Sequence, residues 1–412
     1  MSWALYGSFF YVLSQWLLLI ILAKLGGPTI VGRYTLALAI TAPIVLFSNL
    51  QLRAVLASDV QRTFPFSTYV ALRIVTSLGA LLPICGIAFW VGFTGDQTIV
   101  ICLIGLAKVI ESGSDIAYGA MQKNERMDLV SISKGIRGAL AVGSVAAIFY
   151  QTKSLIAAVV GLNVAWLVVL VLVDCRNLKG LADVSPKRAA RTDFISEVTT
   201  GRMVSLCKLS LPLGVVSMLM SCNTALPRYL LAIFHGEAAV GYFSAIVCFT
   251  IACTIGPEAF GQAALPRLAK YLVESITKFW HLMGMLILAA VLIGVVGIMT
   301  AILEGTDILR VVYQQEFSRY SDLLVMVMVL GMAESICSVL GVGLTAMRRV
   351  NSQVSVLIGV VAVTALSGWW LIPQYAMKGA VLSALLGMTV WGVVYGVLLR
   401  TPRDIAVHGV GY

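Results

Sequence analysis

Long apolar runs separated by short polar segments fill almost the whole chain. A helix needs about 20 mostly apolar residues to cross ~30 Å of hydrocarbon, and each run is long enough to do so. The pattern predicts an all-α protein with twelve spanning helices, at residues 3–23, 34–57, 68–93, 97–121, 128–150, 153–174, 206–234, 239–264, 278–303, 320–346, 352–373 and 378–399. The polar segment 175–205 separates the first six helices from the last six.

A glycine motif is repeated between the first and second helices of each half. The pattern Gly-x-x-x-Val-Gly-x-Tyr at residues 27–34 returns as Gly-x-x-x-Val-Gly-x-Phe at residues 236–243, an offset of 209 residues. Each copy lies between two apolar runs and is expected to form a tight turn. A repeat of this length indicates one six-helix unit written twice. It predicts an N-terminal bundle over residues 1–174 and a C-terminal bundle over residues 206–412.

The composition excludes a water-soluble protein. The 412 residues are 59% hydrophobic and 12% charged, with a mean hydropathy of +0.95. Soluble domains carry roughly 25% charged residues. The chain is therefore predicted to be a polytopic membrane protein, and its first apolar run is expected to be a spanning helix rather than a signal peptide.

The basic residues are distributed unevenly across the predicted membrane. With the N-terminus in the cytoplasm, 21 of the 29 Lys and Arg residues fall on the inner side, seven fall on the outer side, and Lys108 lies within the membrane. The positive-inside rule then places both termini in the cytoplasm and makes 175–205 a cytoplasmic linker. The net charge of +10 is explained by topology, and no basic tail predicts nucleic-acid binding.

The motifs of common catalytic and metal sites are missing from the sequence. Its eight cysteines form no C-x-x-C pair, its three histidines are scattered, and it has no Walker lysine loop. The predicted outer loops are short, the longest being about 304–319, whereas a polymerase or ligase would need a larger outward domain. The sequence predicts no metal, no cofactor and no enzymatic activity, and it favours transport.

The fourth predicted helix carries charge in the middle of the membrane. Lys108, Glu111, Asp115, Tyr118 and Gln122 fall within an arc of roughly 80° on a helical wheel. A charged side chain at the bilayer centre costs about 2.5–3.5 kcal/mol, so this stripe should face protein or water. We expect it to face the interior of the bundle.

The next helix adds Lys134 and Arg137, three residues apart on one face. One hypothesis is structural: Glu111 and Asp115 neutralise Lys108, Lys134 and Arg137 in buried pairs. The other hypothesis is functional: part of this network lines a cavity and binds substrate or a coupling ion.

The second half has a single acidic residue in the corresponding helix. Glu334-Ser335 echoes Glu111-Ser112 at an offset of 223 residues, and no basic residue lies within one turn of Glu334 on its own helix. Glu334 is expected to be neutral and hydrogen-bonded, to bind a proton or cation, or to pair with a basic residue of another helix.

The seventh helix combines two prolines with an arginine. Pro212 and Pro227 are expected to break or kink it and free backbone carbonyls. Arg228 is a candidate phosphate ligand because its planar guanidinium pairs with two oxygens at once, although interfacial anchoring is an alternative. For Arg53 and Arg73, contact with lipid headgroups is at least as plausible as a site role.

Several segments together carry a family resemblance: Leu50-Gln51-Leu52-Arg53 with Asp59, Phe66-x-x-Tyr69-x-x-x-Arg73, Glu111-Ser112-x-x-Asp115-Ile116-x-Tyr118-Gly119-x-x-Gln122, and Leu226-Pro227-Arg228-Tyr229-Leu230. With them the chain resembles the bacterial O-antigen and capsular polysaccharide flippases. These are polysaccharide transporters of the multidrug/oligosaccharidyl-lipid/polysaccharide exporter superfamily.

The resemblance implies two six-helix bundles that face each other across a central cavity and work by alternating access. The implied substrate is an undecaprenyl-diphosphate-linked oligosaccharide, carried from the inner to the outer leaflet of the bacterial cytoplasmic membrane. Polysaccharide polymerases and glycosyltransferases follow as candidate partners, beside membrane lipids. A diphosphate needs cations in the cavity, and the candidates are Arg228, Lys108, Arg53 and Arg137.

Three other functions remain open. A multidrug and toxin extrusion antiporter for organic cations would favour a net-acidic cavity, whereas residues 97–150 place three bases beside two acids on the polar stripe. A major-facilitator transporter would carry a Gly-rich signature that the 58–67 loop lacks. A non-transporting scaffold for glycan synthases would have no need of charge at the membrane centre.

Overall fold

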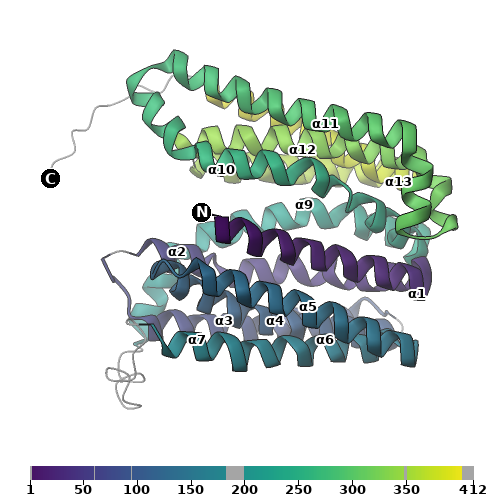
Figure 1. The fold of residues 1–412 in the computed structure, drawn as a ribbon, viewed down its shortest axis with the longest axis horizontal. Coiled ribbons are helices and arrows are strands. Elements are labelled where there is room, and N and C mark those ends of the chain that lie inside the picture. The colour runs from purple at the N-terminus through teal and green to yellow at the C-terminus, as the bar shows by residue number, and fades with distance from the viewer. Residues whose placement is uncertain (1, 60, 94, 182–198, 348–349, 401–412) are drawn as a thin grey trace. The chain divides into compact units, whose positions relative to one another are not determined.

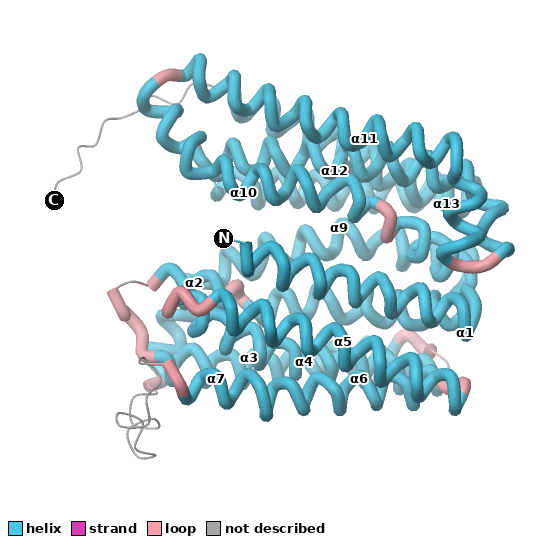
Figure 2. The backbone as a smooth tube through the Cα atoms, viewed as in Figure 1, coloured by secondary structure: helices cyan, strands magenta, loops and turns pink. Residues whose placement is uncertain are grey.

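The computed structural model describes residues 2–59, 61–93, 95–181, 199–347 and 350–400 (Figure 1). All regular elements within these ranges are helical (Figure 2). They are α1 (Ser2–Asn49), α2 (Leu52–Ser58), α3 (Phe66–Trp90), α4 (Gly95–Lys123), α5 (Met127–Thr152), α6 (Leu155–Val169), the π-helix η1 (Leu170–Asp174), α7 (Cys175–Lys179), α9 (Thr200–Val247), α10 (Thr250–Glu274), α11 (Ile276–Val312), the 3₁₀-helix η3 (Gln315–Tyr320), α12 (Ser321–Ala346) and α13 (Val350–Arg400).

Eight helical stretches in the described residues are long and apolar enough to cross a membrane. Three of them, in α1, α9 and α13, contain an internal bend and so supply two arms each. The five straight stretches and the six arms correspond to eleven of the twelve predicted segments, and α4 corresponds to the twelfth. α10 continues the second arm of α9 and belongs to the same predicted segment. The predicted fold class, an all-α polytopic membrane protein, is confirmed.

The chain groups into two compact units. The first unit is Met1–Ala245 with Arg310–Phe317, and the second is Ile246–Leu309 with Ser318–Tyr412. The division into bundles at 1–174 and 206–412 stays a prediction, and residues 182–198 of the predicted linker lie outside the described residues.

The repeated glycine motif forms two bends with the same backbone geometry. Gly27 has φ 76° and ψ −178°, and Gly236 has φ 77° and ψ −179°. Side chains with a Cβ rarely adopt this region, which explains the glycines. The predicted equivalence of the two copies is confirmed. The predicted turn, however, covers more residues than the bend in the structure does. Only one residue leaves the helix at each bend. At the first bend the next residue is Pro28, which suits the first position of a helix.

The two bends pack directly on each other within the first unit. A Cβ placed on Gly32 would overlap the carbonyl oxygen of Glu237, and a Cβ on Gly241 would overlap that of Pro28. The contact is reciprocal, because both glycines and both carbonyls are related by the 209-residue repeat. The Arg33 Nε to Glu237 Oε2 ion pair, 2.7 Å long, joins the same two bends. Backbone contact this close requires glycine at both positions.

The connection predicted at 304–319 is shorter than expected. α11 continues to Val312, and η3 begins at Gln315. Between them, Tyr313 is buried in the first unit: its hydroxyl donates to the carbonyl of Ala245 at 2.7 Å and accepts from Trp16 Nε1 at 3.1 Å. This segment therefore forms part of the core of the first unit.

The seventh helix is expected from sequence to break or kink at its prolines; the break is wrong, and the kink stays a prediction. α9 runs through Pro212 and Pro227 and departs from helical geometry only at Gly236. A proline removes one backbone hydrogen bond, and membrane helices tolerate this loss where neighbouring groups satisfy the freed carbonyls.

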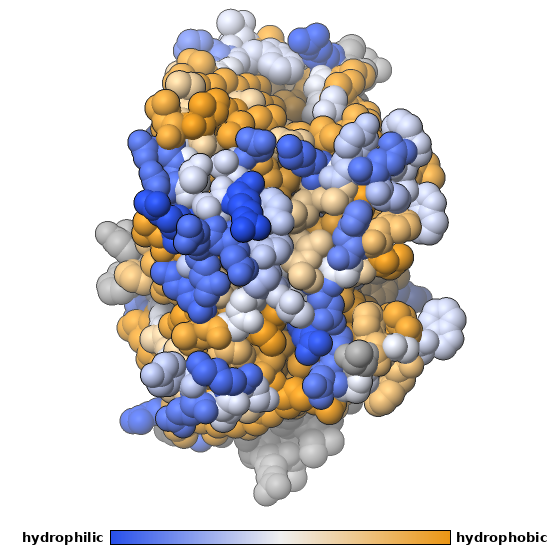
Figure 3. Space-filling view, turned by 90° about the vertical axis from the view of Figure 1, so that its right-hand side faces the viewer, coloured by the Kyte–Doolittle hydropathy of each residue, from blue (hydrophilic) through white to orange (hydrophobic). Residues whose placement is uncertain are grey.

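Each unit has its own hydrophobic core. In the first unit it includes Leu52, Tyr69 and Met121, and in the second it includes Phe279 and Leu344. Many other large apolar side chains are exposed, as expected for lipid contact. The view onto the helix ends in Figure 3 shows hydrophilic residues interrupting this hydrophobic surface.

The bend of α13 falls on an alanine instead of a glycine. Ala376 has φ 47° and ψ −124°, a conformation that strains any residue with a Cβ by about 1–3 kcal/mol. We expect Ala376→Gly to raise the free energy of unfolding by about 1 kcal/mol, because relief of strain exceeds the added flexibility of the unfolded chain. The midpoint of thermal unfolding in detergent measures the change.

Ala362→Gly is the matched control in the same helix. Ala362 is exposed and helical, so glycine there is expected to lower stability by roughly 0.5–1 kcal/mol. Opposite signs for the two variants support the strained bend, whereas a loss of stability in both contradicts it.

Candidate functional site

The polar stripe predicted on the fourth helix exists on α4, in the first unit. Lys108 Nζ lies 2.8 Å from Glu111 Oε2, and the other oxygen of Glu111 accepts a hydrogen bond from the Tyr11 hydroxyl of α1. Lys108 also lies over the ring of Trp166, 5.5 Å from its centroid. Glu111 is thus held between its own helix and α1.

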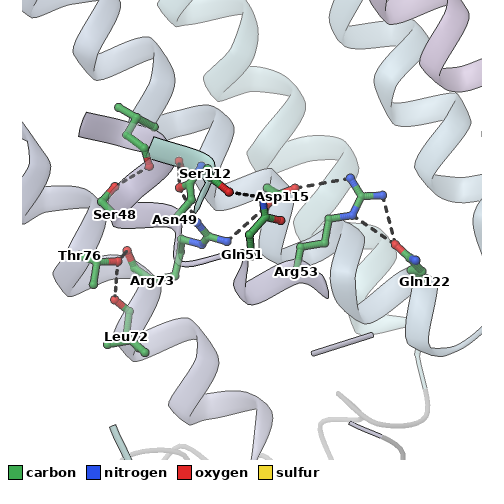
Figure 4. A network of polar contacts seen from close by, with 12 residues as sticks. Ser48, Asn49, Gln51, Arg53, Leu72, Arg73, Thr76, Ser112, Asp115 and Gln122 are labelled. Carbon is green, nitrogen blue, oxygen red and sulfur yellow. Dashed lines mark hydrogen bonds and ion pairs between the residues drawn. The ribbon is translucent and has the colours of Figure 1, made fainter. Parts of the chain in front are cut away.

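One turn further along α4, the carboxylate of Asp115 pairs with two arginines (Figure 4). Arg73 Nη2 of α3 lies 3.1 Å from Oδ2, and Arg53 Nη1 of α2 lies 3.5 Å from Oδ1. Arg73 also donates to Asn49 Oδ1, which accepts a second bond from the Ser112 hydroxyl at 2.7 Å. The contact of Arg73 with lipid headgroups, considered from sequence, is wrong: its side chain is 2% exposed.

The chain is shaped locally to deliver these groups. α1 ends at Asn49, and Leu50 and Gln51 take left-handed conformations with φ of 49° and 50°. Residues other than glycine adopt this region rarely. Here the two left-handed residues end α1, and α2 begins directly after them. Asn49 consequently ends one helix and Arg53 stands in the first turn of the next.

A cavity of about 340 Å³ lies beside this network. Its wall is apolar along α1 up to Leu46 and polar elsewhere, and it is lined by Ala42, Val45, Leu46, Asn49, Gln51, Lys108, Glu111, Ser112 and Asp115. The ion-paired side chains at its edge are between one fifth and one third exposed, so they are accessible to a ligand.

Basic residues outnumber acidic residues in the network beside this cavity, although the charged residues that line the cavity itself are Lys108, Glu111 and Asp115. Lys134 of α5 is half-buried, donates to the Ser8 hydroxyl at 3.3 Å and interacts electrostatically with both carboxylates. The group therefore holds four cations and two carboxylates, which are Arg53, Arg73, Lys108, Lys134, Glu111 and Asp115. An excess of two positive charges suits an anionic group with two or more negative charges.

Arg137 belongs to a separate buried cluster. Its Nη2 donates to the Ser114 hydroxyl and lies 3.3 Å from Asp174 Oδ2, with exposed fractions of 1% for Arg137 and 0% for Asp174. The rings of Tyr118 and Trp166 each lie 5.6 Å from the guanidinium. The π-helix η1 ends at Asp174, and its wider turn changes which face of the segment the carboxylate occupies.

The structural hypothesis for the stripe holds in part. Lys108 and Glu111 form the expected pair. Asp115, however, pairs with Arg53 and Arg73, and Arg137 pairs with Asp174, because side chains of α2, α3 and η1 are closer partners than those expected from sequence spacing.

Two predicted site residues lie elsewhere. Arg228 on α9 is half-buried, donates from Nε to the Ser244 hydroxyl at 3.1 Å and from Nη1 to the Thr224 carbonyl at 2.6 Å, and lies over Phe243. It is not among the residues lining the α4 cavity. Glu334 is half-buried on α12 in the second unit. The site roles of both stay predictions.

Asp59, part of the family resemblance, organises a turn at the end of α2. Its carboxylate accepts hydrogen bonds from the backbone of Thr63 and Phe64, at 2.9 and 3.3 Å, and from the Tyr69 hydroxyl at 3.2 Å. Partial burial raises the pKa of Asp59, but these hydrogen bonds outweigh it and hold the pKa below its ordinary value. Within the described residues, no group of three His, Cys, Asp or Glu side chains could hold a metal ion.

Known proteins resemble this chain in sequence and in fold. The sequence matches the family described as polysaccharide biosynthesis protein over residues 2–272. The capsular polysaccharide biosynthesis protein CapF of Staphylococcus aureus is 25% identical over 388 residues, which are 93% of this chain and 94% of CapF.

Solved structures of membrane transporters share the fold. An inward-facing multidrug resistance transporter of the MATE family, in the MOP superfamily, has a TM-score of 0.75 at 12% identity, covering 95% of this chain and 94% of the transporter. The lipid II flippase MurJ, in an inward closed conformation, has a TM-score of 0.73 at 11% identity, covering 96% of this chain and 87% of MurJ.

Proposed function

Because the chain belongs to the family of polysaccharide biosynthesis proteins, we propose that it is a flippase for a lipid-linked oligosaccharide. It moves an undecaprenyl-diphosphate-linked repeat unit across the bacterial cytoplasmic membrane by alternating access, for O-antigen, capsule or exopolysaccharide synthesis. No bond is made or broken in this process, so the protein is a transporter and not an enzyme. Both termini lie in the cytoplasm, and polymerases and glycosyltransferases act beside it.

The observation that carries the proposal is the charge around the α4 cavity. Of the charged residues, Lys108, Glu111 and Asp115 line the cavity, and Arg53, Arg73 and Lys134 bring the surrounding network to four cations and two carboxylates. Arg53, which is partly exposed, has a planar group that fits phosphate oxygens. A diphosphate is a strongly anionic headgroup, which the excess of positive charge in this network would attract. The same positive charge would repel an organic cation. The likeness to CapF, a capsular polysaccharide biosynthesis protein, favours the same substrate class.

The proposed site assigns a role to each candidate residue. Arg53 and Lys108 contact the diphosphate at the α4 cavity, and Arg228 provides a further cationic contact. The buried pair of Arg137 supports α4 from behind, and Lys134 adds to the positive potential. Glu111 and Asp115 hold the cations in place, and Glu334 in the second unit is a coupling site.

A multidrug antiporter is the second candidate, because a MATE transporter has the fold in common with this chain. Such a protein needs no lipid-linked sugar and would act on organic cations. Display of surface polysaccharide and resistance to organic cations distinguish the two functions.

We expect Lys108→Ala and Arg228→Ala to reduce display of surface polysaccharide at least tenfold. The host would be a bacterium whose own copy of the gene is deleted and replaced by the variant. Charge-assisted hydrogen bonds contribute about 1.5–3 kcal/mol, and 1.4 kcal/mol corresponds to a factor of ten in affinity. Quantitative glycan staining of cells with equal protein abundance measures the effect.

Lys270→Ala is the control, since Lys270 is an exposed lysine of α10 that pairs with Glu274 on the next turn of its helix. It should leave display unchanged. Normal display by both Lys108→Ala and Arg228→Ala, at wild-type abundance, contradicts the assignment of these residues. Loss of resistance to organic cations in the deletion strain, with normal glycan, would instead identify a drug antiporter.

A further inference from the structure

The carboxylate of Asp115 holds its two arginines by unequal contacts. Arg73 is the closer one, at 3.1 Å, and its side chain is 2% exposed. Its second nitrogen is fixed by Asn49, which Ser112 holds in turn. Arg73 is therefore a permanent partner, because removing it from Asp115 would leave a buried guanidinium without a counter-ion.

Arg53 is the loosely held partner. Its Nη1 lies 3.5 Å from Asp115, at the outer limit for an ion pair, and its side chain is 24% exposed. Its Nε and Nη2 both share the single oxygen Oε1 of Gln122, each at 3.3 Å. These distances exceed those of strong charge-assisted hydrogen bonds, which are about 2.7–2.9 Å.

The backbone that carries Arg53 is fixed while its side chain is exposed. A Cβ on Gly119 of α4 would lie 3.2 Å from the Cα of Arg53, so α2 packs closely on α4 at this point. The guanidinium lies 5.6 Å from the ring centroid of Tyr118, a flat surface over which it can move. The residue can thus change partner without any helix moving.

We propose that Arg53 is an exchangeable arginine, which passes from Asp115 to the diphosphate of the substrate while Arg73 keeps Asp115 paired. The inference rests on the proposed function and deepens it. Asp115, which lines the cavity, is then a positioning residue with two tasks. It holds Arg53 beside the cavity before substrate arrives, and it competes with the diphosphate for Arg53 when substrate must leave.

Two physical arguments favour exchange at Arg53 over exchange at Lys108. An arginine can bind two phosphate oxygens through its fork. The contacts that Arg53 would leave, to Asp115 and Gln122, are long, whereas the contact that Lys108 would leave is short. Lys108 is held at 2.8 Å by Glu111, for which no other ion pair is found among the described residues. Release of Lys108 would leave that carboxylate poorly compensated, whereas release of Arg53 leaves Asp115 with Arg73.

The test is binding of inorganic pyrophosphate and of undecaprenyl diphosphate to the full-length protein in detergent. Arg53→Ala is expected to weaken binding of both ligands about tenfold to a hundredfold, and Arg53→Lys by less. Asp115→Asn is expected to tighten binding about twofold to fivefold, because it removes a partly exposed competitor. The double variant Arg53→Ala/Asp115→Asn should show no tightening.

Asp128→Asn is the control for net charge. It removes a carboxylate from the Arg126 pair, 2.9 Å long, at the start of α5 and should leave both affinities unchanged. If Asp115→Asn does not fold, Gln122→Ala replaces it, because it frees Arg53 from its other acceptor and leaves the Arg73 pair intact. It should tighten binding less than twofold, and only when Arg53 is present.

The outcomes separate this inference from the proposed function. Wild-type protein that binds neither ligand contradicts the proposed substrate class. Binding that is equally strong in Arg53→Ala, or a tightening that persists in the double variant, overturns the exchange at Arg53 and leaves the substrate class standing.

Discussion

Asp174→Ala is expected to lower the free energy of unfolding by about 3–5 kcal/mol, the largest effect of any single change in the described site. Asp174 and its partner Arg137 are buried almost completely, at 0% and 1% exposure. The variant leaves the guanidinium between two aromatic rings, and among the described residues its remaining hydrogen bond is to the Ser114 hydroxyl. Thermal unfolding of the purified protein, followed by loss of the monodisperse peak, measures the change.

The double variant Arg137→Met/Asp174→Leu is the informative control. It removes both charges and keeps most of the buried volume, so it should recover most of the stability that Asp174→Ala loses. Asp128→Ala removes a carboxylate from an exposed pair and should leave the midpoint unchanged. A midpoint of Asp174→Ala equal to that of the wild type would falsify the buried pair.

Gly32→Ala and Gly241→Ala are expected to lower stability by about 3 kcal/mol each, at the upper end of the usual range for overpacking. In both variants the new methyl group meets backbone, the carbonyl of Glu237 or of Pro28, and backbone cannot rotate away as a side chain can. The two bends must separate, which also stretches the Arg33 to Glu237 ion pair. Similar losses in the two variants are expected because the contact is reciprocal.

Gly79→Ala and Gly86→Ala provide matched controls on α3. A Cβ at either position meets nothing within 4 Å, so alanine should keep or slightly increase stability. The midpoints of thermal unfolding of the four variants, compared in one detergent, measure the expected loss of stability. Gly32→Ala and Gly241→Ala proteins as stable as the α3 controls would contradict the close contact of the two bends.

Periodic features of the sequence predicted much of this structure. The 100° spacing of charges on α4 identified Lys108, Glu111 and Asp115 as one polar face, and the structure places them at one cavity. The repeated glycines at positions 27 and 236 predicted two equivalent corners, and their dihedral angles agree within two degrees. Both signals depend on residues close together in the sequence, so they can be interpreted without knowledge of the tertiary fold.

Pairing between helices could not be predicted in the same way. Arg73 and Asp115 are 42 residues apart, and Arg137 and Asp174 are 37 apart, so no helical period connects them. Asp174 gave only one signal, as a single acid at the end of an apolar run. The direct contact between the glycine bends also depends on tertiary packing, because glycine spacing gives a turn but does not identify the neighbour.

Transport by the purified protein in lipid vesicles tests the proposed flippase function itself. An undecaprenyl-diphosphate-linked oligosaccharide would be incorporated on both leaflets, and a membrane-impermeant glycosidase would report how much sugar reaches the outside. We expect the wild-type protein to expose the inner pool much faster than empty vesicles do, and Arg53→Ala to lose most of this increase. Exposure of the sugar at the rate of empty vesicles, with uptake or efflux of an organic cation by the same preparation, would contradict the proposed flippase function.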